Sequence, residues 1–319
     1  MSQKLLSVVG ATGIQGGSVV RAILKAGGYR VRAITRDPES DGSKKLAALG
    51  VEVVQADLND AASLEKAFAG SHVIFAVTNF FDRFGQLDVE EILKTELQQG
   101  INLANAAAAT PTLEHYIWST LPNSRKLSNG QHIVPHFDAK NKVDDYIKSN
   151  QTLFNKTTFF WVTFYATNFR FPMYTPFRVS TAGPNKYVQL QGTSSSIPMK
   201  SMGDAGINVG LFFNAIISQP EKTRGKFVLA HVEDLTAGEF LASWSKGQGK
   251  QAQFIHVDKQ TYYGLWPMWA EEMDKMHMFW EATQDKSWGG EPDILTKDDL
   301  DISGLVSTAV AFAEMKDWE

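Results

Sequence analysis

Residues 5–27 read LLSVVGATGIQGGSVVRAILKAG and place three local patterns in a row. The run LLSVV predicts a buried strand, and the apolar positions near the end repeat with the period of a helix. Between them, Gly10 suits a tight turn, Gly13 a close backbone approach to a pyrophosphate, and Gly16 close packing of helix on sheet. We interpret the stretch as a phosphate-binding loop at a helix N-terminus, with a turn that binds no ligand as the alternative.

Strand-like runs alternate with helical patterns through the first half of the chain. These runs lie at 29–35, 51–57, 72–78, 115–120 and 157–166. Such alternation is typical of a parallel sheet with right-handed crossovers, whose ligands lie at the carboxyl ends of the strands. The predicted fold class is therefore α/β, with a Rossmann-type doubly wound parallel sheet.

The pattern changes after the sixth strand-like run. Residues 170–205 are rich in proline and turn residues, and residues 261–319 read mainly as helix with several tryptophans. We predict a nucleotide-binding domain over 1–168 and a smaller α+β domain over most of 169–319. Strand-like runs near 226–232 and 252–258 are candidates to return to the first domain.

The composition excludes several classes of protein. The chain of 319 residues has no cysteine, which excludes disulfides, thiol catalysis and cysteine metal sites. A formal net charge of −4 and scattered histidines disfavour direct nucleic-acid binding and a metal centre. No signal peptide or bilayer-spanning run is evident. We expect a cytoplasmic protein that binds no membrane, with the nucleus as an alternative compartment.

The second strand-like run ends in Thr35-Arg36-Asp37. An NAD site would place an acid at the tip of this strand, whereas an arginine forms a forked pair with the 2′-phosphate of NADP(H). Arg36 therefore favours NADP(H), and its alternative is an ordinary surface residue. Asp57, at the tip of the third run, either bonds the adenine amino group or caps the following turn.

Several segments resemble the NmrA-like family, an atypical branch of the short-chain dehydrogenases. The first are VVGATGIQGGSVVRAIL, AITRDP, QADLND and VIFAVTNF, and later ones are HFDAKNKVDDYI, FYATNF and LTAGEFLASWSKGQGKQAQFIHV. The resemblance covers nearly the whole chain. It departs at Gln99-Gly100-Ile101, where family members often carry Gln-Gly-Lys.

The resemblance implies a Rossmann domain, a smaller C-terminal domain and a cleft between them. It also implies a set of NADP(H) contacts, from the phosphates through Arg36 and the adenine to the nicotinamide end. In chain order these are Gly10, Thr12, Gly13, Ile14, Gln15, Gly16, Arg36, Asp57, Leu58, Thr78, Asn79, Lys140, Tyr165 and Asn168.

The candidate catalytic residues match the short-chain dehydrogenase pattern only in part. Short-chain dehydrogenases use serine, tyrosine and lysine, and the lysine lowers the pKa of the tyrosine, which acts as general acid. Ser119 and Lys140 suit two of these roles, but His136 stands where the tyrosine is expected. His136 is either a proton donor, which the Lys140 cation disfavours, or a residue that packs or caps the helix start. Tyr165 is the other candidate acid, or a wall of the cofactor site.

The family contains reductases and cofactor-sensing regulators, so two functions stay open. The expected one is NADPH-dependent reduction of a hydrophobic small molecule that carries a carbonyl, imine or activated alkene. The alternative is a non-catalytic NADP(H)-sensing protein with a regulatory protein partner, and a homodimer is also open. A group of apolar side chains suggests a substrate pocket, with domain core as the alternative for each. They are Phe169, Phe171, Met173, Tyr174, Trp266, Trp269, Phe279 and Trp280.

Overall fold

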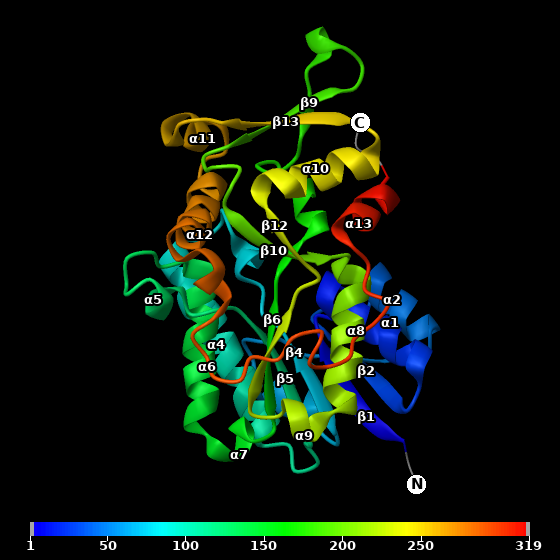
Figure 1. Ribbon diagram of the computed structural model, residues 1–319. Coiled ribbons are helices and arrows are strands. Elements are labelled where there is room, and N and C mark those ends of the chain that lie inside the picture. Colours follow the sequence, from blue (N-terminus) through cyan, green and yellow to red (C-terminus); the bar gives the residue numbers. More distant parts are fainter. Residues whose placement is uncertain (1–2, 317–319) are drawn as a thin grey trace.

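A parallel sheet of seven strands forms the centre of the computed structural model, which describes residues 3–316 (Figure 1). The strands follow the order β11-β6-β5-β4-β1-β2-β3. Their bounds are β1 Lys4–Val9, β2 Tyr29–Thr35, β3 Glu52–Gln55, β4 Val73–Ala76, β5 His115–Thr120, β6 Thr157–Val162 and β11 Lys226–Ala230. The chain order reverses between β1 and β4, which confirms the doubly wound α/β fold and places a crevice at their carboxyl ends.

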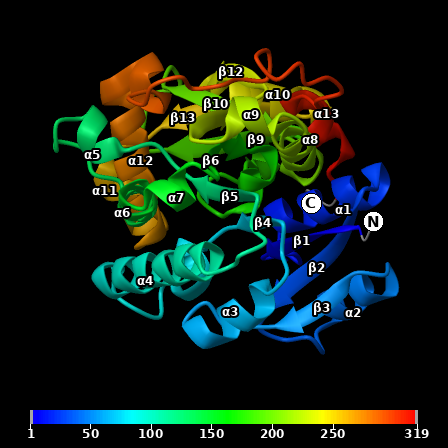
Figure 2. The same ribbon diagram turned by 90° about the horizontal axis from the view of Figure 1, so that it is seen from below.

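Helices cover both faces of this sheet (Figure 2). One face carries α1 (Ile14–Ala26), α2 (Asp41–Ala48) and α8 (Ala205–Ser218), and the other carries α3 (Ala61–Phe68), α4 (Val89–Ala108), α6 (Pro135–Ser149) and α7 (Gln151–Phe154). The bodies of the inner strands β1, β4, β5 and β6 and of β11 are almost entirely buried between the two layers, as in most parallel sheets, whereas β2 is about half buried and the edge strand β3 is more exposed. No helix in residues 3–316 is both long and apolar enough to cross a membrane.

The C-terminal half builds a second layer of structure above the crevice. It contains two three-stranded sheets, β12-β10-β7 and β13-β9-β8. Their strands are β7 Phe164–Tyr165, β8 Phe177–Arg178, β9 Lys186–Gln191, β10 Pro198–Gly203, β12 Glu233–Thr236 and β13 Gln251–His256. The larger helices here are α10 (Ala237–Gln248), α11 (Lys259–Leu265), α12 (Trp269–Thr283) and α13 (Thr308–Glu314). Short helices fill the connections: α5 Ser124–Leu127, α9 Pro220–Thr223, η1 Phe80–Arg83, η2 Ala166–Arg170, η3 Ser180–Ala182 and η4 Gln284–Trp288.

The two candidate returning strands behave differently. β11 joins the main sheet beside β6, in parallel register from Lys226 opposite Thr158. β13 does not return, because it pairs in parallel with β9 in the outer sheet. The two runs have similar sequence patterns, and only the packing of distant segments distinguishes them.

Two element boundaries shape the crevice. The helix α6 begins at Pro135, whose fixed φ suits the first turn, so His136 and Lys140 lie on one helix. The strand expected over 157–166 ends at Val162, and a separate short strand, β7, carries Tyr165 into the second layer.

Gly16 allows α1 to lie directly against the loop that follows β1. A Cβ built on Gly16 would lie 2.3 Å from the carbonyl oxygen of Gly10, and Gly10 has a φ of +66°. Neither backbone group can move aside without shifting the strand or the helix. The glycine pattern therefore sets the distance between α1 and the sheet.

We expect Gly16→Ala to destabilise the fold by about 1–3 kcal/mol, because a methyl group must enter a space already filled by backbone. Chemical denaturation of the purified protein would measure the free energy of unfolding. Gly264→Ala is the matched control, since a Cβ at Gly264 in α11 meets nothing within 4 Å. Equal stability of both variants would contradict the packing role of Gly16.

Candidate functional site

Two hollows meet at the carboxyl ends of the central strands. A groove of about 520 Å³ follows the glycine loop, and a cavity of about 300 Å³ lies beside it under α12. We call them the glycine-loop groove and the aromatic cavity. The residues that line both are Ile14, Gln15, Thr78, Asn79 and Tyr165. A ligand that fills the groove would therefore end against the contents of the cavity.

The predicted cofactor residues gather around this junction. Those that line the glycine-loop groove are Gly10, Thr12, Gly13, Ile14, Gln15, Gly16, Arg36, Asp57, Leu58, Thr78, Asn79 and Tyr165. Lys140 and Asn168 line the adjoining aromatic cavity instead. Segments from across the first half of the chain thus converge because their strands end at one edge of the sheet.

The start of α1 has the features of a phosphate site. Gly13 caps the helix without any side-chain hydrogen bond, and its backbone N–H donates to Gly10 O at 2.9 Å. A Cβ on Gly13 would lie 3.3 Å from that oxygen, so any larger residue would crowd the loop. The helix N-terminus is left to an anionic ligand, and a groove of this size suits a dinucleotide.

Arg36 already has a partner in the groove wall. Its Nη1 and Nη2 donate to the two carboxylate oxygens of Asp82 at 2.8 and 3.1 Å. This charge-assisted fork raises the pKa of Arg36. Asp82 lies in η1, and nothing near it in the sequence pointed to Arg36.

Asp57 plays the local turn role and also lines the groove. Its Oδ1 accepts hydrogen bonds from the backbone and side-chain nitrogens of Asn59, both at 2.8 Å. The N-cap of α3 is Asp60. The side chain of Gln99, in the segment that departs from the family pattern, donates to Asn59 Oδ1 at 3.1 Å. The residues around Asp57 therefore hold one another in place at the rim.

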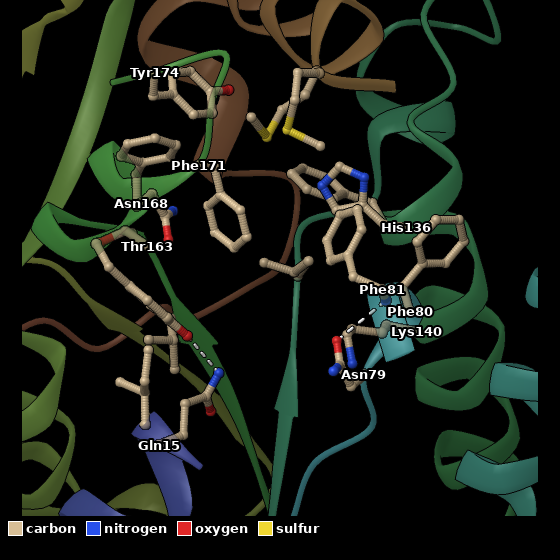
Figure 3. Close-up of a pocket in the computed structure, with 18 of the residues that line it drawn as sticks. Gln15, Asn79, Phe80, Phe81, His136, Lys140, Thr163, Asn168, Phe171 and Tyr174 are labelled. Carbon is tan, nitrogen blue, oxygen red and sulfur yellow. Dashed lines mark hydrogen bonds between the residues drawn. The ribbon is translucent and has the colours of Figure 1, made fainter. Parts of the chain in front are cut away.

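The aromatic cavity has two facing walls (Figure 3). Phe80, Phe81 and His136 lie on one side, and Asn168, Phe171 and Tyr174 lie on the other. Of the eight predicted pocket residues, those that line the cavity are Phe171, Met173, Tyr174, Trp269 and Trp280. Phe169 and Phe279 belong to the hydrophobic core, and the partly buried Trp266 packs against it. The lining that the sequence did not suggest includes Phe80, Phe81, Phe137, Met273, Met276 and Trp288.

Gln15 links the two candidate catalytic hydroxyls. Its Nε2 donates to Tyr165 Oη at 2.6 Å, and its Oε1 accepts from Ser119 Oγ at 2.7 Å. Burial raises the pKa of Tyr165 to about 12, against the opposing effect of the Gln15 hydrogen bond. Ser119 itself is buried behind Gln15, on β5. The structure thus brings Tyr165 to the junction and places Ser119 in a supporting position.

Lys140 is a buried cation with its own anion. Its Nζ donates to Thr78 O at 3.1 Å and Thr78 Oγ1 at 2.7 Å, and lies 3.1 Å from Glu96 Oε1 on α4. Thr78 Oγ1 in turn donates to Glu96 Oε1 at 2.7 Å. Two hydrogen bonds and one ion pair therefore engage the ammonium group, so a ribose hydroxyl would have to compete with these partners.

His136 is held by a carboxylate from the far end of the chain. Its Nδ1 lies 2.6 Å from Glu272 Oε1, and its backbone N–H donates to the same oxygen at 3.3 Å. Glu272, on α12, therefore caps α6 and orients the imidazole, which the sequence left open between catalysis and capping. The charged group against the ring is Glu272, whereas Lys140 is engaged by Glu96.

We expect Lys140→Met to lower the free energy of unfolding by about 3–5 kcal/mol, because Glu96 would remain as a buried, unpaired charge. The double variant Lys140→Met/Glu96→Gln should recover much of that loss. Thermal unfolding without nucleotide would measure both. A single variant as stable as the wild type would show that Lys140 has no structural role.

Comparisons with known proteins agree with this architecture. A model described as the NmrA-like family matches residues 2–313. An NmrA-like family domain-containing oxidoreductase of Aspergillus hancockii is 30% identical over 298 residues, which cover 91% of this chain and 86% of the relative.

Solved structures show the same fold at low identity. NmrA, described as a negative transcriptional regulator, superposes in complex with NAD with a TM-score of 0.76, at 23% identity over 99% of both chains. Its complex with NADP gives 0.74, at 22% identity over 98% of this chain and 95% of that one. An NADPH-dependent quinone oxidoreductase from Escherichia coli, complexed with NADPH, gives 0.70 at 16% identity over 97% and 98%.

Proposed function

Because this chain belongs to the NmrA-like family, we propose that it is an NADPH-dependent reductase of a hydrophobic small molecule with a carbonyl, imine or activated alkene. The observation that carries the proposal is the meeting of the glycine-loop groove and the aromatic cavity at Tyr165. A cofactor groove that opens into an apolar cavity brings a hydride donor and a bulky substrate together away from water. The oxidoreductase relative from Aspergillus hancockii supports the same class of reaction.

The groove residues divide the cofactor among them. The glycine loop and the α1 N-terminus would hold the pyrophosphate, and Arg36 would hold the 2′-phosphate. Asp57 and Leu58 would lie beside the adenine, and Thr78 and Asn79 beside the ribose, since all four line the groove. The nicotinamide would then reach the junction, where Lys140 and Asn168 line the adjoining cavity.

Tyr165 is the proton donor in this proposal. The bound cofactor supplies a hydride to the substrate, which then needs one proton to complete the reduction. Because Gln15 Nε2 donates to Tyr165 Oη, the hydroxyl hydrogen of Tyr165 is free to point at a substrate atom. A pKa of about 12 keeps the phenol protonated at neutral pH. Ser119 fixes the Gln15 amide from behind.

His136 is the alternative donor, on the opposite wall. Glu272 engages Nδ1, which leaves Nε2 as the nitrogen that can exchange a proton with a ligand in the cavity. Phe81 lies against the ring, with centroids 5.2 Å apart, and Phe80 lies 5.9 Å away. This apolar setting shields the imidazole from solvent.

A non-catalytic NADP(H)-sensing protein is the second candidate function. The observation that favours it is the engagement of Lys140 by Thr78 and Glu96, together with the position of Ser119 behind Gln15. The serine, tyrosine and lysine of a short-chain dehydrogenase are therefore not gathered around one substrate atom. NmrA, which shares the fold, is described as a negative transcriptional regulator.

A reductase should oxidise NADPH in the presence of aromatic or terpenoid-like carbonyls and imines. The loss of NADPH is measured from the absorbance at roughly 340 nm. Tyr165→Phe should lower kcat by about 100-fold or more, because it removes a general acid and keeps the ring. His136→Ala is compared in the same assay. Tight NADP binding without turnover on any substrate would favour the sensing function, and full activity of Tyr165→Phe would exclude Tyr165 as the donor.

Arg36→Ala should lower the affinity for NADP(H) by about tenfold or more and leave the affinity for NAD(H) nearly unchanged, since only NADP(H) carries the 2′-phosphate. Isothermal titration with both oxidised dinucleotides measures this difference. Equal loss for the two cofactors would contradict the 2′-phosphate assignment.

A further inference from the structure

The ion pair between Arg36 and Asp82 lies in the wall of the glycine-loop groove, which both residues line. Arg36 directly follows β2, and Asp82 comes from η1, the short helix that follows β4. The two terminal nitrogens of the guanidinium are engaged as a fork: each donates to one carboxylate oxygen, at 2.8 and 3.1 Å. This is the arrangement that an arginine also adopts around a phosphate.

We propose that Asp82 selects between the two dinucleotides by occupying the fork of Arg36 as an internal substitute for the 2′-phosphate. NADP(H) must displace Asp82 from Arg36, whereas NAD(H) leaves the pair intact. The inference rests on the proposed binding of a dinucleotide in the groove, and it does not depend on whether the protein reduces a substrate.

The competition follows from charge and geometry. A doubly charged phosphate that binds the same two terminal nitrogens must displace the carboxylate, and the two anions repel each other if both lie against one guanidinium. The pair is exposed, with 66% of the Arg36 side chain and 41% of the Asp82 side chain accessible, so water screens it and a phosphate can exchange for it. With NAD(H), the Asp82 carboxylate stays paired with Arg36 and has lone pairs left to accept a hydrogen bond from a ribose hydroxyl, the role that an acidic residue has in NAD sites.

The exchange would also reach the aromatic cavity, because η1 belongs to both hollows. Asp82 faces the groove, while Phe80 and Phe81 from the same helix line the cavity. The Phe81 ring stacks on Trp269 of α12, with centroids 5.5 Å apart and an interplanar angle of 21°. Release of Asp82 would free the exposed end of a segment whose other side forms the cavity wall. NADP(H) would then loosen this segment, and NAD(H) would not.

Binding of the two oxidised dinucleotides to Asp82→Asn tests the selection directly. We expect the affinity for NADP⁺ to rise by roughly fivefold, because the competing charge is gone, and the affinity for NAD⁺ to stay equal or fall. Asp37→Asn is the matched control: it removes the same charge from the same groove, but Asp37 Oδ1 accepts from the backbone of Glu39. Unchanged or weaker NADP⁺ binding by Asp82→Asn, or an equal gain with Asp37→Asn, would overturn the proposal.

The background of Arg36→Ala adds a second test. In that background, Asp82→Asn should change the affinity for NADP⁺ very little, because the Arg36 guanidinium for which Asp82 and the phosphate compete is absent. A gain as large as in the wild-type background would assign the effect to general charge repulsion and overturn the competition.

Amide hydrogen exchange of the segment 79–87 provides a readout that is independent of activity. NADP⁺ should speed exchange there relative to NAD⁺ in the wild type, and Asp82→Asn should show the faster exchange without nucleotide. Identical exchange with both dinucleotides would refute the link to the cavity. If no substrate supports NADPH oxidation, the proposed reductase activity is refuted, and the binding and exchange results expected for Asp82 are unaffected. If those binding and exchange results are not observed while NADPH is oxidised, the role of Asp82 is refuted and the reductase activity is not.

Discussion

The pairing of the buried Lys140 charge is the interaction on which the site depends. A cation with so little water around it must have an anion, and Glu96 of α4 supplies it. Along the same face of α6, His136 lies one turn before and Asp144 one turn after. His136 meets Glu272 of α12, and Asp144 accepts from Trp118 and Thr120 of β5, while burial raises its pKa to about 7. α6 is thereby fixed to the sheet, the neighbouring helix and the C-terminal layer at once.

This anchoring gives the two hollows their shared junction. With α6 held in place, Lys140 fastens Thr78 at the end of β4, and Thr78 and Asn79 then lie between the groove and the cavity. The opposite side of the junction is built by Gln15, which the glycine loop brings to Tyr165. In a short-chain dehydrogenase a lysine at this position would bind the cofactor. Here Lys140 instead connects α6 to Thr78 after β4 and to Glu96 of α4. The same geometry fits both proposed functions: proton donation by Tyr165 in a reductase, and binding of a dinucleotide by a protein without catalytic activity.

The sequence indicated which residues would meet in the groove better than it indicated the partners of the candidate catalytic residues. The glycine loop, Arg36 and the strand tips are each recognisable from a few neighbouring residues, and the sheet brings them to one groove. The partners of the candidate catalytic residues had no such signal. Ser119 lies 104 residues from Gln15, and His136 lies 136 residues from Glu272. From the sequence alone, a glutamate in a helical pattern is predicted to be exposed, and only the fold shows that it is buried.

The sequence by itself determined the α/β alternation, the tight βα turn and the polar tips of the strands, because strand period, helix period and glycine geometry are properties of short segments. Tertiary structure alone decided that β11 returns to the main sheet and β13 does not. It also decided which carboxylate meets each buried cation or imidazole, and that Asp82 takes the fork of Arg36 from 46 residues away. The physical reason is that an ion pair depends on distance in space and on loss of water, and neither is encoded in the residues beside it.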